Sequence, residues 1–381
     1  MKILVNKLKL GLIGLVGVGM LHLPAYAVED VLSTPAVQTK LASKNLLLDI
    51  AKAGDRLVSV GSRGHIIYSD DDGVSWQQSI VPVAVLLNAI SFVDDSYGWA
   101  VGHSGVVLHT TDGGKTWVTQ FDGNLANKMI ITQAKRYVES IKNEMGIAAT
   151  EDERSELEYQ AEDASYALED AILDAEVGAS KPFLDVLFSS RTEGFAVGAY
   201  GYFFKTKDGG ITWENYGTRI ENSDRFHLNS INIAKGGNLF IVGEAGVLFR
   251  SKDGGESWVT LESPYAGSFF GVTGTHESDV VIVFGLRGHL YRSQNAGDSW
   301  TRIDSGSEGT LMSAAVSQEG DISVVGNSGT VLFSKDGGRS FSEVIREDRL
   351  SNTSAVFVEA EKIALVGENG VNLAKPTGAD F

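Results

Sequence analysis

Short apolar runs alternate with glycine-rich and aspartate-rich turns along most of the chain, and the alternation repeats. The stretch from Val101 to Trp117, VGHSGVVLHTTDGGKTW, holds the end of one apolar run, a turn with two glycines, a second apolar run, and a turn that ends in an aromatic residue. Apolar runs rich in β-branched and aromatic residues, broken every few positions by Gly and Asp, are typical of short β-strands and not of helices. The dominant pattern therefore predicts an all-β fold.

The first turn, written V-G-x-x-G with Phe in place of Val in one copy, occurs seven times. Successive copies are 41, 96, 45, 42, 41 and 41 residues apart, so one interval contains an insertion. A period near 40 residues with about four strands per unit is typical of β-propeller blades. We therefore predict a seven-bladed β-propeller, and we expect both glycines of each turn to adopt positive φ, where a Cβ atom would clash.

Six copies continue into a second turn with the pattern S/T-x-D-x-G-x-S/T-W. Its aspartate can accept hydrogen bonds from nearby backbone N–H groups, and its aromatic residue can bury about 150–250 Å². Asn replaces Asp in one copy and Phe replaces Trp in another, and both substitutes suit the same turn. We predict a structural role for these residues, which are Asp71, Trp76, Asp112, Trp117, Asp208, Trp213, Asp253, Trp258, Asn295, Trp300, Asp336 and Phe341.

The insertion, residues 124–181, lacks the turn residues of the repeat and is rich in helix formers. Apolar residues at helical spacing run from Ile130 to Met145 and from Leu157 to Ala175, and Thr150 with Glu153 forms a capping-box pattern between the two series. Residues 151–176 contain 11 carboxylates and one Arg. We predict an acidic helical hairpin inserted between blades 2 and 3, with blades 1–2 in residues 45–123 and blades 3–7 in residues 182–381.

The variable residues of the V-G-x-x-G turns and the inserted hairpin should lie on one face of the predicted ring. If the strands of each blade run outward in order, the V-G-x-x-G turns share a face with the links between blades, and the second turns lie on the opposite face. The hairpin belongs to such a link, so it should rise from the V-G-x-x-G face. The variable residues of these turns are candidates for partner binding, although unconstrained solvent loops would vary in the same way; the candidates are Arg63, His103, Tyr200, Glu244, Arg287, Asn327 and Glu368.

The second turn is the Asp box, or bacterial neuraminidase repeat, and the stretch SYGWAVGHSGVVLHTTDGGKTW from Ser96 to Trp117 resembles the repeat of photosystem II stability/assembly factor-like proteins. Apart from the insertion, the resemblance covers roughly residues 46–375. It implies a seven-bladed, non-catalytic propeller that binds a protein as an assembly or accessory factor of a membrane or envelope complex. In a photosynthetic host this would be photosystem II assembly, and in other bacteria an accessory role, for example with a transporter.

The resemblance also implies an arginine-rich binding patch on the propeller. Arg63 and Arg287 occupy matching turn positions in blades 1 and 5. Arg191, Arg219 and Arg225 are candidates for the same surface. The other V-G-x-x-G turns carry no arginine, so the sequence matches such a patch in part.

The N-terminus reads as an export signal. Residues 1–27 combine three lysines with an apolar run and end in Ala25-Tyr26-Ala27, a small-x-small cleavage pattern; an uncleaved anchor is the alternative. The expected location is the periplasm, or the thylakoid lumen in a photosynthetic host, and the lack of cysteine argues against a lipoprotein. Residues 28–44 are predicted to close the ring, because the last repeat ends after three strands and residues 31–41 could add the outer strand.

Charge narrows the range of partners. The formal net charge is −17, and it becomes −20 without residues 1–27, which contain Lys2, Lys7, Lys9 and no acid. Such a charge argues against nucleic acid and against direct binding to anionic lipid. We therefore expect a protein partner. The sequence is also compatible with a monomeric chain.

Enzyme functions need residue patterns that this sequence does not provide. Sialidases with Asp boxes typically carry an R-I-P motif, which is absent. A glycosidase needs two carboxyl groups about 5–9.5 Å apart, and Glu244 with Glu368 is the single carboxylate pair among the V-G-x-x-G turns. The histidines lack metal-ligand spacing. We predict no catalytic, cofactor-binding or metal-binding residues; the alternative is a glycan-binding or glycosidase-type Asp-box propeller.

Overall fold

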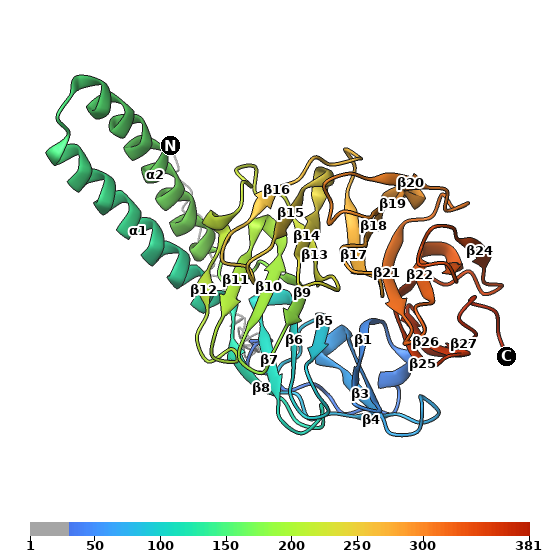
Figure 1. Cartoon of the computed structure of the whole chain (residues 1–381). Coiled ribbons are helices and arrows are strands. Elements are labelled where there is room, and N and C mark those ends of the chain that lie inside the picture. Colours follow the sequence, from blue (N-terminus) through green and yellow to red (C-terminus); the bar gives the residue numbers. More distant parts are fainter. Residues whose placement is uncertain (1–29) are drawn as a thin grey trace, which may run out of the picture.

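The computed structural model describes residues 30–381, and the predicted signal segment 1–27 lies outside this range. The described residues form six four-stranded antiparallel sheets and one three-stranded sheet, arranged as blades in a ring (Figure 1). Consecutive strands of each blade are neighbours in its sheet, and the first strands of all blades face one another around the ring axis. The predicted seven-bladed β-propeller is therefore confirmed.

The strands are short, as the sequence pattern predicts. Those of blades 1–4 are β1 (Leu47–Ala53), β2 (Arg56–Gly61), β3 (Ile66–Ser69), β4 (Gln77–Gln78), β5 (Leu87–Phe92), β6 (Gly98–Gly102), β7 (Val107–Thr110), β8 (Val118–Phe121), β9 (Phe183–Phe188), β10 (Gly194–Gly198), β11 (Phe203–Thr206), β12 (Glu214–Asn215), β13 (Leu228–Ile233), β14 (Leu239–Gly243), β15 (Leu248–Ser251) and β16 (Val259–Thr260). Those of blades 5–7 are β17 (Phe269–Gly274), β18 (Val281–Gly285), β19 (Leu290–Ser293), β20 (Thr301–Ile303), β21 (Leu311–Val316), β22 (Ile322–Gly326), β23 (Thr330–Ser334), β24 (Ser342–Ile345), β25 (Asn352–Glu359), β26 (Lys362–Gly367) and β27 (Gly370–Ala374).

The ring closes by direct contact between the first and last blades. β25 of blade 7 lies against β1 of blade 1. The Thr353 hydroxyl donates to the Leu47 carbonyl at 2.9 Å, and the Ser354 hydroxyl donates to Asp49 Oδ1 at 2.7 Å. Apolar side chains of both blades share one buried cluster, which includes Leu57, Ile67, Ala364 and Val366.

The prediction that residues 28–44 supply the outer strand of blade 7 is wrong for the described part of this segment. Residues 30–41 contain no strand, and a single 3-10 turn, Ala42–Lys44, follows them. The Ala36 N–H donates to the Val81 carbonyl at 3.0 Å, and the Ala84 N–H donates to the Val31 carbonyl at 3.0 Å. Residues 31–39 therefore lie along the end of blade 1 and its link to blade 2. The turn Ala42–Lys44 contacts β27 of blade 7 and β3 of blade 1, so it lies where the two blades meet without adding a strand. Because β1 and β25 already close the ring, blade 7 keeps three strands.

In the Asp boxes of blades 1–6, an Asp or Asn oxygen accepts the backbone N–H four residues later, whereas the indole bond is made only by Trp76, Trp117 and Trp258. In blade 2, the Asp112 carboxylate accepts the Thr116 N–H at 3.0 Å and the Thr116 hydroxyl at 2.7 Å. The indole of Trp117 is buried and donates to a backbone carbonyl within the same turn at 3.0 Å. In blade 5, Asn295 Oδ1 accepts the Ser299 N–H at 3.0 Å, so Asn replaces Asp without loss of the turn.

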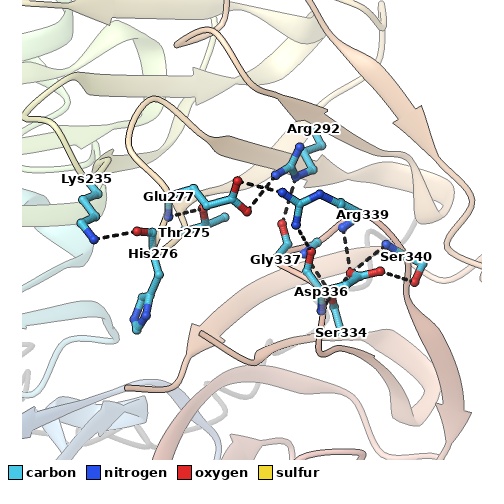
Figure 2. A network of polar contacts seen from close by, with 11 residues as sticks. Lys235, Thr275, His276, Glu277, Arg292, Ser334, Asp336, Gly337, Arg339 and Ser340 are labelled. Carbon is cyan, nitrogen blue, oxygen red and sulfur yellow. Dashed lines mark hydrogen bonds and ion pairs between the residues drawn. The ribbon is translucent and has the colours of Figure 1, made fainter. Parts of the chain in front are cut away.

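Buried cations join neighbouring blades on the Asp-box face. The third residue of the third strand is Lys205, Arg250 or Arg292 in blades 3–5, and each donates to a backbone carbonyl in the Asp box of the next blade. Figure 2 shows the contact between blades 5 and 6: Arg292 Nε donates to the Gly337 carbonyl at 2.9 Å, and Arg292 Nη2 lies 3.3 Å from Glu277 Oε1. The Arg292 side chain is only 2% exposed, whereas the Glu277 side chain is 44% exposed, so the cation is buried and its carboxylate partner reaches the surface.

We expect Arg292→Met to lower the free energy of unfolding by about 1–3 kcal/mol, because it removes the buried donor of the half-buried Gly337 carbonyl and of Glu277 Oε1. Arg339→Met is the matched control, since Arg339 binds the other oxygen of Glu277 at 2.8 Å but is 53% exposed. This control should cost less than about 1 kcal/mol. Chemical denaturation of both variants measures the difference, and equal losses would contradict a structural role for the buried cation.

Two half-buried carboxylates connect inner strands of different blades. Asp185 in β9 accepts the Ile231 N–H of the next blade at 2.9 Å, and Asp49 in β1 accepts the Ile90 N–H of the next blade at 2.9 Å. Burial raises the pKa of Asp49 to about 6 and that of Asp185 to about 7, although the hydrogen bonds oppose these shifts. The negative charge of Asp49 adds to the rise in the pKa of Asp185.

The raised pKa of Asp185 predicts a pH-dependent stability. Because its folded value of about 7 lies above its ordinary value of 3.8, the folded chain binds this proton more tightly than the unfolded chain does. The contribution to stability is therefore complete below pH 4 and is lost as the pH rises to 7, at about 1.4 kcal/mol per pKa unit. Thermal melts should show Asp185→Asn gaining stability relative to the unsubstituted chain between pH 4 and pH 7; a constant difference would contradict the raised pKa.

The insertion forms two packed helices, α1 (Gly123–Ile147) and α2 (Glu151–Glu176), between β8 and β9 (Figure 1). The predicted helical hairpin and the capping box of Thr150 and Glu153 are both confirmed. Val138 and Ile141 of α1 are buried against Ala164 of α2, so the two apolar series pack against each other. Within residues 30–381, no helix is both long and apolar enough to cross a membrane.

Candidate partner-binding site

The first glycine of each V-G-x-x-G turn is needed for close packing and not for its φ angle. Gly198 has φ −170°, which is extended backbone, so the expectation of positive φ is wrong at this position. A Cβ atom on Gly198 would lie 2.4 Å from the Pro182 carbonyl oxygen, and the Ala199 N–H donates to the same oxygen at 3.1 Å. The corresponding Cβ distances at all seven first glycines are 2.0–2.4 Å. Each turn is therefore held against the backbone that enters its own blade.

The second glycine of each turn has positive φ, as predicted, with values from 63° to 80°. In blades 1–6 the residue before it also has positive φ, for example Tyr200 at 57° and Arg287 at 57°. This conformation recurs in six blades, so it belongs to the turn itself. It directs the variable side chains onto the surface of the ring.

The seven candidate residues lie on one face, because every blade has the same strand order. Glu244 is half-buried, and its carboxylate accepts the His227 N–H at 3.2 Å. Tyr200 lies beside the hairpin, whereas the others occupy separate blades around the ring. The exposed candidates are Arg63, His103, Tyr200, Arg287, Asn327 and Glu368.

A groove of about 940 Å³ lies between the base of the hairpin and the V-G-x-x-G face of blade 3. Tyr137 of α1 and Tyr200 of blade 3 both line it, and they are 54% and 55% exposed. Tyrosines offer an apolar ring with a polar end, which suits contact with a polypeptide. Small side chains on the hairpin leave room for an occupant, and they are Ala134, Ala164, Ala167 and Ala171.

Buried polar contacts hold the hairpin against blade 3 at the end of this groove. Asn127 Nδ2 donates to the Gly178 carbonyl at 3.0 Å, and Asn127 Oδ1 accepts from the Tyr202 hydroxyl at 3.2 Å. Lys181 forms an ion pair with Asp174 and lies 5.5 Å from the centre of the Tyr202 ring. Burial raises the pKa of Tyr202, and Asp174 adds to the rise, so its hydroxyl keeps its proton.

The arginines near the groove agree with the predicted patch in part: Arg219 and Arg225 were predicted, and Arg136 was not. Arg225, in the link between blades 3 and 4, pairs with Asp170 of α2 at 3.3 Å. Arg219 lies in the same link, and Arg136 of α1 lines the groove without an ion pair to any described residue. Arg191 instead lies in the β9–β10 turn on the Asp-box face, so its assignment to the patch is wrong. Sequence spacing did not identify Arg136, because only the fold brings α1 beside blade 3.

The carboxylates and histidines considered for catalysis or metal binding do not lie together. Glu244 and Glu368 lie in blades 4 and 7, which are not neighbours in the ring. Burial lowers the pKa of His289, as do Arg302 and Arg287, so its imidazole is neutral near pH 7. Among residues 30–381, no three His, Cys, Asp or Glu side chains are grouped to hold a metal ion.

These features define a class of protein, the seven-bladed Asp-box propeller, here with a helical hairpin between two blades. The family model described as "Photosynthesis system II assembly factor YCF48" matches residues 28–176 and residues 172–324. The chain therefore belongs to the YCF48 family, and the resemblance predicted from its repeats is confirmed.

Similar proteins include members of the same family. "Photosystem II assembly lipoprotein Ycf48" of Synechococcus sp. (strain CC9902) is 26% identical over 247 residues, which are 63% of this chain and 69% of that protein. A solved structure described as "YCF48 bound to D1 peptide" has a TM-score of 0.60 and 16% identity, over 90% of this chain and 99% of that chain. YCF48 from Cyanidioschyzon merolae has a TM-score of 0.58 and 14% identity, over 89% and 97%.

Enzymes share this fold as well. A GH74 enzyme of Niastella koreensis has a TM-score of 0.56 and 13% identity, over 87% of this chain and 52% of the enzyme. At such identities the structural similarity shows the fold alone, because unrelated activities occur on one propeller scaffold.

The contacts of Asn127 predict that the hairpin can be loosened without unfolding the ring. Asn127→Ala leaves the Tyr202 hydroxyl and the Gly178 carbonyl unpaired, which should cost about 1–3 kcal/mol locally. Hydrogen exchange should show faster exchange in α1 and α2, with the blade strands unchanged. Asn124→Ala is the control, since Asn124 is exposed in the same helix. Unchanged exchange in the hairpin of Asn127→Ala would show that these contacts do not hold it.

Proposed function

We propose that this chain is a non-catalytic, exported protein that binds another protein as an assembly or accessory factor of a membrane or envelope complex. The observation that carries the proposal is the groove in which the hairpin meets the V-G-x-x-G face. Its Ala-lined side can accept bulky side chains, and its tyrosines can contact a peptide backbone. Tyr200 and the exposed candidates of the other turns extend the same surface around the ring.

The family supports a role in assembly. One relative is described as a photosystem II assembly lipoprotein, and one related structure is described as bound to a D1 peptide. In a photosynthetic host, we propose photosystem II assembly in the thylakoid lumen for this chain. In another bacterium, we propose a periplasmic accessory of an envelope complex, such as a transporter. Export would use residues 1–27, and the 381 residues contain no cysteine that could carry a lipid.

Glycan processing fits the site less well. The carboxylates of Glu244 and Glu368 belong to blades that are not neighbours, whereas glycosidases need carboxyl groups about 5–9.5 Å apart. The Glu244 carboxylate is also engaged with a backbone N–H of its own blade. We therefore propose a function without catalysis.

The proposal can be tested by filling the groove. Ala167 is exposed and lines the groove, so Ala167→Trp should exclude a bound segment. We expect affinity purification of this variant from the native envelope to lose partner proteins that the unsubstituted chain captures, by roughly tenfold or more. Val74→Trp is the control, because Val74 is 74% exposed in the Asp box of blade 1, on the opposite face.

The partners are then identified in both preparations by mass spectrometry. Capture of the same proteins in equal amount by Ala167→Trp and Val74→Trp would overturn the proposed site. Cleavage of a glycan by the purified chain would overturn the non-catalytic function.

A further inference from the structure

One side of α2 carries a row of exposed apolar residues that no other part of the described chain covers. Tyr159, Tyr166 and Leu173 are 65%, 58% and 58% exposed, and Val177 just beyond the helix is 74% exposed. The first three are seven residues apart, so they lie on one side of the helix along about 20 Å of its length. The residues that pack on α1, such as Ala164 and Leu168, point to the opposite side. Figure 1 shows the hairpin extending away from the ring, so no blade lies over this side of α2.

Carboxylates follow the same seven-residue spacing. Glu162, Glu169 and Glu176 each come three residues after an exposed apolar residue. Together the two series repeat every 3.5 residues on average, which is the spacing with which one helix packs against another in a coiled coil. The pattern therefore combines apolar contact positions with negatively charged positions along one line of contact. We call these six residues the outer face of α2.

We propose that the outer face of α2 is a docking surface for an amphipathic helix of a partner protein that carries Lys or Arg at heptad spacing beside its apolar residues. Charge complementarity selects this occupant, since a basic helix would pair with the three glutamates while its apolar residues cover the tyrosines and the leucine. Flanking acids strengthen the selection, because the helix segment 151–176 has 11 carboxylates and one Arg.

The same charges disfavour other occupants. A second copy of this chain would bring one row of glutamates against another, and like charges at an interface cost free energy. A surface of anionic lipid would be repelled for the same reason. The groove lies on another side of α2, lined by Ala167 and Ala171, so the two surfaces can be occupied independently.

A pair of synthetic peptides tests this surface on the full chain. One is a helical peptide with Leu and Lys at alternating heptad positions, and the other has Glu in place of each Lys. We expect the Leu/Lys peptide to bind in fluorescence anisotropy, and to bind more weakly as salt increases. The Leu/Glu peptide should bind at least roughly tenfold more weakly. Equal binding of the two peptides would overturn the proposal.

Substitution of the apolar positions separates docking from nonspecific attraction. The triple variant Tyr159→Gln, Tyr166→Gln and Leu173→Gln keeps every charge and uses a residue with good helix propensity. We expect its affinity for the Leu/Lys peptide to fall roughly tenfold or more, with helix content unchanged by circular dichroism. The matched control places Gln at three exposed apolar residues outside the hairpin, which are Val74, Ile80 and Ile211. Unchanged affinity in the triple variant would mean attraction by charge alone and would overturn the proposal.

Two further measurements exclude the other occupants. In sedimentation, we expect the unsubstituted chain and the triple variant to have the same oligomeric state. In flotation with anionic vesicles, we expect the two proteins to bind equally little. A dimer or a vesicle-bound form that the unsubstituted chain shows and the triple variant lacks would overturn the proposal. Ala167→Trp should leave binding of the Leu/Lys peptide unchanged, so failure of the groove and failure of this surface give different results.

Discussion

The contact between a backbone carbonyl and the first glycine of each V-G-x-x-G turn underlies the rest of this structure. The carbonyl that enters each blade occupies the space of a missing Cβ and accepts the next N–H of the turn, in all seven blades. Any larger residue would push the entering backbone away from the turn. Each link between blades is thereby held against the turn of the blade that follows it.

This contact also determines where the hairpin lies. In blade 3 the entering carbonyl belongs to Pro182, only a few residues after α2 ends. The C-terminal end of the hairpin is therefore held beside Tyr200, and Asn127 attaches its N-terminal end to Tyr202. With both ends fixed at blade 3, the groove forms between the helices and the ring. The opposite side of α2 is left without a neighbour.

One face of the ring joins neighbouring blades, and the other carries the variable residues. On one face, the Asp boxes and the buried cations Lys205, Arg250 and Arg292 satisfy backbone groups and join neighbouring blades. On the other face, the glycines leave two variable residues per turn, and the link that contains the hairpin rises from the same side. On the face that we propose for binding, the constraint is confined to the turn glycines, so the two residues between them are free to vary.

The repeat period, the Asp boxes and the helical hairpin could be read from the sequence, because each depends on residues close together in the chain. Turn glycines, the Asp112 type of hydrogen bond and the capping box of Thr150 need no distant partner. What depended on contacts between distant segments was decided by the tertiary structure alone: Arg292 reaching the next blade, Arg191 on the opposite face, and residues 30–41 lying along blades 1 and 2 without adding a strand. The groove belongs to this second group, since Tyr137 and Tyr200 line one groove only when the base of the hairpin lies against blade 3.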